Sequence, residues 1–106
     1  MFSNQLIIID MIYRVSNKEA KGSSFTVLVP NIHQIRYVEG NRVAIVEIEG
    51  REDPHEQVDW LIYQETLQGW EPPYEMDELS PVKRAEILSR ISESLHVLEM
   101  PHELVK

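Results

Sequence analysis

At 106 residues the chain has the length of one domain, and 42% hydrophobic with 26% charged residues is typical of a globular protein that buries a core. It contains no cysteine, which excludes disulfide bonds, thiolate metal sites and cysteine nucleophiles. The formal net charge is −8, and residues 47–78 hold eleven acidic residues against one basic residue, Arg51. A nucleic-acid binder needs a basic surface, so this distribution favours a basic partner instead. We expect a single domain over residues 1–106.

Residues 5–16 form a nearly continuous apolar run that predicts a buried strand. One face of the extended chain would carry five apolar side chains: Ile7, Ile9, Met11, Tyr13 and Val15. Asp10 interrupts the run, no basic segment precedes it, and it is shorter than a membrane span. We therefore expect neither a signal peptide nor a membrane helix.

The next two segments predict a turn and a second strand. Residues 17–24 are polar and contain Gly22, which is typical of a turn. Phe25, Val27 and Val29 then alternate as a strand, which Pro30 ends.

Residues 35–50 predict a β-hairpin. Two runs rich in β-branched residues flank Glu39-Gly40-Asn41, where Gly40 and Asn41 both tolerate the positive φ of a tight turn. In the second run one face carries Ala44, Val46 and Ile48. The opposite face continues into solvent through Glu47 and Glu49.

A further strand is predicted after a charged loop at residues 51–57. Val58, Trp60 and Ile62 alternate as in a strand, with Trp60 in the core. The strand pattern ends near Gln64, and residues 65–69 predict a turn or a short helical turn.

One long helix is predicted from Pro81 to about Leu98, with Ser80 as its N-cap and Pro81 at the first helical position. Its apolar stripe consists of Ile87, Leu88, Ile91, Leu95 and Leu98. Its other side would carry Lys83, Arg84, Arg90 and Glu93, and Pro101 would end the segment. The predicted fold is α+β: an antiparallel sheet of about five strands with this one amphipathic helix packed on one face.

The strongest candidate metal ligands are Asp53, His55 and Glu56, which lie within four residues. They lack the converging geometry of a His-Glu-x-x-His helix, so a solvated loop is the simpler interpretation. The glycines are isolated and form no phosphate-binding loop, and the sequence reveals no histidine positioned beside a serine. We expect no catalytic residue, metal or cofactor.

The segment Gly69–Ser80, GWEPPYEMDELS, joins two aromatic rings and two prolines to four carboxylates. Pro72 and Pro73 fix φ and favour an extended Glu71, which predicts a rigid crossing from the sheet to the helix, with Trp70 holding the corner. A rigid acidic loop loses less entropy on binding, so it also suits a contact surface, with Tyr74 as its anchor. The predicted partner-contacting residues lie in this segment and near the preceding hairpin: Glu71, Tyr74, Glu75, Asp77, Glu78, Glu47, Glu49 and Glu52.

Four features in a fixed order resemble a known family. They are Tyr37-x-Glu39-Gly40-x-Arg42, Ile62-Tyr63, Trp70-Glu71-Pro72-Pro73-Tyr74, and Ser80 opening a helix striped with Ile and Leu. Over about residues 35–98 the chain is similar to immunity protein 74 of bacterial polymorphic-toxin and contact-dependent growth inhibition systems. It departs from that family where Glu71 replaces a frequent aspartate, and residues 1–34 carry none of its motifs.

This resemblance implies a non-enzymatic, cytoplasmic antitoxin that binds and neutralises the C-terminal domain of a cognate toxin. Many such toxins are nucleases with basic substrate-binding faces, which an acidic protein is suited to cover. Two alternatives come from other classes: a small acidic regulatory or scaffold module that binds another basic protein, and a minor metal-dependent hydrolase using Asp53, His55 and Glu56.

Overall fold

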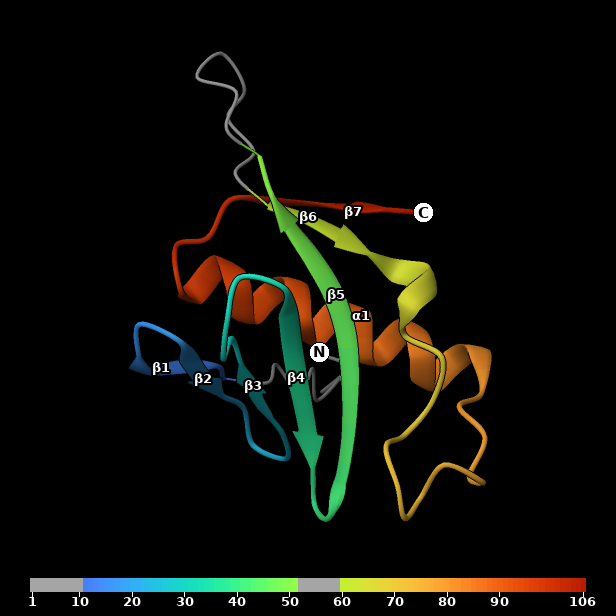
Figure 1. Cartoon of the computed structure of the whole chain (residues 1–106). Helices are drawn as coiled ribbons and strands as arrows, with labels where there is room; N and C mark the ends of the chain where they lie inside the picture. The colour runs from blue at the N-terminus through green and yellow to red at the C-terminus, as the bar shows by residue number, and fades with distance from the viewer. Residues whose placement is uncertain (1–10, 52–59) are drawn as a thin grey trace, which may run out of the picture.

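A computed structural model describes residues 11–51 and 60–106, in which one long helix lies across one face of a seven-stranded sheet (Figure 1). The elements in chain order are β1 (Tyr13–Ser16), β2 (Glu19–Lys21), β3 (Thr26–Leu28), β4 (Gln34–Glu39), β5 (Arg42–Gly50), β6 (Trp60–Tyr63), the 3₁₀ turn η1 (Gln64–Thr66), α1 (Pro81–Val97) and β7 (His102–Val105). Each strand pairs with its neighbours in chain order. All these pairs are antiparallel except β6 with β7, which is parallel because the chain crosses over through α1 between them.

The α+β architecture is confirmed, but the number of strands in the described residues exceeds the predicted five. The segment 17–24 is not only a turn, because β2 forms within it and buries Ala20. The chain also continues after Pro101 into β7, which the sequence did not predict.

The core lies between α1 and the face of the sheet that α1 covers. On the sheet side it is formed by alternating residues: Phe25, Val27, Val29, Ile35, Tyr37, Ala44, Val46, Ile48 and Ile62. On the helix side it is formed by the predicted stripe: Ile87, Leu88, Ile91, Leu95 and Leu98. Trp60 is half-buried and packs against this cluster. The alternation in β3, β4 and β5 and the helical stripe therefore predicted their buried residues correctly, whereas Trp60, expected in the core, lies at its margin.

The helix ends also follow the prediction. The Ser80 hydroxyl accepts a hydrogen bond of 3.0 Å from the backbone N–H of Lys83, and Pro81 opens the helix. At the other end Glu99 has a φ of 58°, and Met100 N–H donates to the Leu95 carbonyl at 2.8 Å. These contacts turn the chain back toward β7.

The predicted hairpin forms with a two-residue turn, since Glu39 pairs with Arg42. Gly40 alone adopts a positive φ, of 60°, and Asn41 does not. A positive φ at the first central residue only is the pattern of a type II′ turn, whose twist matches that of the flanking strands.

The prediction of a buried N-terminal strand is wrong for the described part of that run. Met11, Tyr13 and Val15 are 81%, 57% and 48% exposed. β1 is an edge strand whose four residues are all exposed, and it meets the end of α1 through Arg14, which donates to the Leu98 carbonyl at 3.2 Å. Of residues 11–16 only Ile12 packs against the core. The earlier part of the run, including Ile7 and Ile9, lies outside the described residues.

The charged side of the helix is not simply a solvated face either. Lys83, Arg84 and Arg90 are half-buried, while Glu93 is exposed as expected. The Arg84 guanidinium donates to the carbonyls of Leu67, at 3.0 Å, and of Gln64, which fastens η1 to the helix. Long basic side chains at the margin of the stripe lie along the apolar surface and carry their charge to polar groups beyond it.

Candidate functional site

The segment after η1, residues 69–80 (the proline segment), is attached to the sheet at its first residues. Trp70 forms a β-bridge with Ala44, and the Glu71 N–H donates to the Val43 carbonyl at 2.7 Å. The Trp70 side chain is 7% exposed, and its ring centroid lies 6.4 Å from that of Tyr37 in the core. The Pro72–Pro73 peptide bond is cis. Trp70 therefore holds the corner, as predicted.

Arg42, at the start of β5, holds the tip of the same segment. Its guanidinium lies over the Tyr74 ring, 4.5 Å from the centroid, and donates to Asp77 at 2.6 Å. The hydrogen bond to Asp77 raises the pKa of Arg42 above its ordinary value. Tyr74 is half-buried, and Arg42 covers one face of its ring. The Asp77 carboxylate is already paired with Arg42.

The face of the sheet away from α1 carries a shallow acidic groove beside this segment. It consists of two adjoining depressions of about 360 Å³ each, which share Ile45, Thr66, Gln68 and Glu71. Glu47 borders one depression and Glu75 the other. No ion pair forms at the carboxylates of Glu47, Glu71 or Glu75 with any residue in 11–51 or 60–106. The groove thus brings together acids from the hairpin and from the proline segment, 24 residues apart in the case of Glu47 and Glu71.

The groove is held in shape by backbone contacts. The Thr66 hydroxyl accepts a hydrogen bond from the Glu47 N–H at 2.8 Å and donates one to the Tyr63 carbonyl at 2.6 Å. These bonds fix η1 against β5. Strand, turn and proline segment therefore form one preassembled surface.

The other predicted contact residues do not line this groove in the described part of the chain. Glu49 is exposed on the same face and accepts a hydrogen bond from the Tyr63 hydroxyl, which raises the pKa of that hydroxyl. Glu78 is exposed in the proline segment. Glu52 and the candidate metal ligands Asp53, His55 and Glu56 lie outside the described residues.

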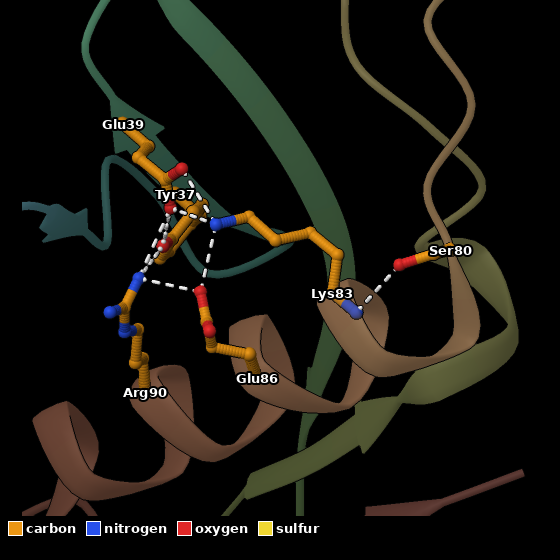
Figure 2. A network of polar contacts seen from close by, with 6 residues as sticks. All are labelled: Tyr37, Glu39, Ser80, Lys83, Glu86 and Arg90. Atoms are coloured by element: carbon orange, nitrogen blue, oxygen red, sulfur yellow. Dashed lines mark hydrogen bonds and ion pairs between the residues drawn. The ribbon is translucent and has the colours of Figure 1, made fainter.

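A polar network that the sequence did not reveal lies at the opposite face, between β4 and α1 (Figure 2). Glu39 accepts hydrogen bonds from Lys83, at 2.7 and 2.8 Å, from Arg90 at 3.1 Å and from the Tyr37 hydroxyl. The Glu86 carboxylate forms ion pairs with the Lys83 ammonium, at 2.8 Å, and with the Arg90 guanidinium, at 2.9 Å. Arg90 also lies over the Phe25 ring, 4.8 Å from its centroid. One signal for it was present: Lys83, Glu86 and Arg90 recur at helical spacing beside the apolar stripe.

The ionisation of this network is set by its surroundings. Burial, with the hydrogen bond to Glu39, raises the pKa of the Tyr37 hydroxyl, which therefore stays neutral. Burial opposes ionisation of Glu39, but hydrogen bonds from Lys83 and Tyr37 and the charges of Lys83 and Arg90 outweigh it, so its pKa is lowered. The network joins helix to sheet with compensated charges, which suits a structural role.

A second groove, of about 490 Å³, lies between the flank of α1 and strand β7. Beside it the Ser92 hydroxyl lies 2.6 Å from Nε2 of His102, whose Nδ1 lies 2.8 Å from the Met100 carbonyl. Because a carbonyl only accepts, Nδ1 carries the proton and Ser92 donates to Nε2. Burial, together with neighbouring His96, lowers the pKa of His102 despite the bond to Met100. This pair ties β7 to the helix.

In residues 11–51 and 60–106 no three His, Asp or Glu side chains converge as a metal ion would require. No helix in this part of the chain has the length and apolar character needed to cross a membrane.

Comparison with curated proteins and with solved structures finds no match. The family model described as immunity protein 74 matches residues 32–103, a range that contains the hairpin, the proline segment and the helix. The chain therefore belongs to the immunity protein 74 family.

Proposed function

We propose that this protein is an antitoxin that binds the C-terminal domain of a cognate toxin in the cytoplasm and neutralises it. Membership of an immunity protein family supports a toxin as the partner. We assign the binding surface to the acidic groove bordered by Glu47, Glu71 and Glu75. Its carboxylates make no ion pair within the described residues, so they are available to a basic partner.

The charge of the groove points to the chemistry of the toxin. A nuclease has to neutralise phosphates, so its substrate-binding face is basic. A surface of opposite charge accelerates the encounter with such a face and selects the orientation of docking. We therefore propose that the toxin is a nuclease and that the antitoxin covers its substrate-binding face.

The structure of the groove favours tight binding as well as fast encounter. The anchoring of Glu71 to Val43 and of Asp77 to Arg42 holds the proline segment in place before a partner arrives. Side chains and loops that are already ordered lose little entropy on association. Neutralisation by this route is steric and electrostatic, and needs no catalytic step from the antitoxin.

The test is co-expression with the C-terminal domain of a candidate toxin encoded by a neighbouring gene. We expect growth to be restored, the two proteins to copurify, and nucleic acid cleavage by the purified toxin to stop at one equivalent of antitoxin. If the protein copurifies with a toxin that is not a nuclease and inhibits it, the antitoxin function stands and the proposal that the toxin is a nuclease is rejected. Absence of both protection and binding would reject the antitoxin and favour a regulatory module for another basic protein.

A further inference from the structure

The strand β7 presents a free backbone edge. In the described residues β7 is the last strand of the sheet, paired with β6 on one side only (Figure 1). The Pro101 carbonyl accepts from Trp60 N–H at 3.1 Å, and successive residues of a strand direct their backbone groups to opposite sides. Glu103 therefore faces β6, while the N–H and C=O groups of His102 and Leu104 face outward.

An apolar groove runs beside this edge. The groove of about 490 Å³ lies between β7 and the flank of α1, and Leu88 and Leu104 contribute apolar side chains to it. Leu104 pairs with Ile62, whose side chain faces the helix, so a strand added next to β7 would direct alternate side chains to this groove. Main-chain hydrogen bonds and a row of side-chain pockets are the two requirements of recognition by strand addition.

The edge is fixed rather than frayed. The hydrogen bond of 2.6 Å between Ser92 and His102 fastens the start of β7 to the helix that forms the other wall of the groove. Edge and groove are therefore positioned relative to each other before a partner binds, which lowers the entropy lost on docking.

We propose that an extended segment of the toxin pairs with β7 and inserts alternate apolar side chains into the groove between β7 and α1. This proposal rests on the antitoxin function. The two grooves adjoin the same turn, η1, because Gln64 lines the groove beside β7 and Thr66 lines the acidic groove. A toxin bound at the acidic groove could therefore also reach β7. The exposed Glu93 carboxylate at the groove favours a basic side chain in the toxin segment. A second copy is disfavoured, because each chain carries a net charge of −8.

The backbone part is tested with Leu104→Pro against Leu104→Ala. Both remove the leucine side chain, but only proline removes an outward N–H while leaving the bonds to β6 in place. We expect Leu104→Pro to bind the purified toxin domain about tenfold more weakly than Leu104→Ala, at similar melting temperatures. Equal dissociation constants would overturn the proposal.

The groove is tested independently with Ser89→Trp, which fills it from the helix, against Val82→Trp. Val82 is 79% exposed on the same helix and does not line the groove. We expect Ser89→Trp to weaken binding to the toxin and Val82→Trp to leave it unchanged. Equal binding by both variants, with wild-type protein still neutralising the toxin, would reject strand addition and leave the antitoxin function standing. A wild-type dimer in sedimentation that Leu104→Pro dissociates would assign the edge to a second copy.

Discussion

The two faces of the sheet use their charged side chains in different ways. On the face covered by α1, Glu39 is surrounded by Lys83, Arg90 and the Tyr37 hydroxyl, and the charges of Glu39 and Glu86 are balanced by those of Lys83 and Arg90. On the open face, Glu47, Glu71 and Glu75 border a groove and form no ion pair within the described residues. The half-buried set joins the helix to the sheet, and the open set is available for a partner.

The same difference separates residues with a structural role from residues that face solvent. Tyr37, Glu39, Arg42 and Trp70 all lie within the range that the family model matches, and each contacts another part of this protein. They hold the hairpin, the proline segment and the helix together. The carboxylates of the open groove lie beside them, on a surface that these contacts keep in place.

The largest expected effect comes from placing a charge in the covered face. Ile91 is 1% exposed, so Ile91→Asp would bury an unpaired carboxylate and should lower the free energy of unfolding by about 3 kcal/mol or more. Thermal and urea denaturation measure it. Ser89→Asp, on the exposed side of the same helix, is the control, and an equal melting temperature for the two variants would refute the packing of α1.

The next effect concerns the compensated network. Glu39→Gln keeps the shape but removes the charge that Lys83 and Arg90 approach, and it should lower the free energy of unfolding by about 2 kcal/mol. Because the pKa of Glu39 is lowered in the folded state, its contribution is present above its ordinary pKa and is lost as pH falls through the folded value. The difference between wild type and Glu39→Gln should therefore shrink toward acid pH.

Denaturation at several pH values checks this prediction. Glu93→Gln, an exposed carboxylate on the same helix, provides the control and should show little change at any pH. A constant difference between Glu39→Gln and wild type down to strongly acid pH would show that the charge of Glu39 contributes nothing to stability.

These contacts show where prediction from sequence succeeds. Alternation in β4, β5 and β6 and the stripe of α1 identify which side chains are buried, because burial follows directly from the period of each element. Short edge strands escape this approach: β2 has one buried residue, and β7 pairs in parallel with a strand about 40 positions earlier.

The site was predictable only in part, for the same reason. The sequence located the acidic segment and its rigid prolines. It could not show that Arg42 would stack on the Tyr74 ring and pair with Asp77, which lies 35 positions further along the chain. Nor could it show that Glu47 and Glu71 border one groove. Such pairs depend on register and crossover geometry, which residue spacing along the chain does not encode.

A smaller pair of effects, opposite in sign, sharpens the description of the covered face. The buried Ser94 hydroxyl has no hydrogen-bond partner in the described structure, so Ser94→Ala should raise the free energy of unfolding by about 1 kcal/mol. Ser92→Ala removes the bond to His102 and should lower it by a similar amount. Urea denaturation of both variants measures the two signs, and a loss of stability in Ser94→Ala would imply that its hydroxyl is paired.

The smallest effect on stability is expected on the open face, where function should change instead. Glu71→Gln with Glu75→Gln removes two carboxylates that have no partner within the described residues, so the melting temperature should stay nearly constant. Because charge steering acts mainly on encounter, the variant should associate more slowly with the toxin domain, and the rate should depend less on salt. Glu19→Gln with Glu99→Gln is the matched control, since it changes the charge equally near the β1–β2 side of the sheet. Stopped-flow association across a series of ionic strengths measures both. If the two double variants associate at the same rate and with the same salt dependence, the net charge of the protein attracts the toxin and the groove does not.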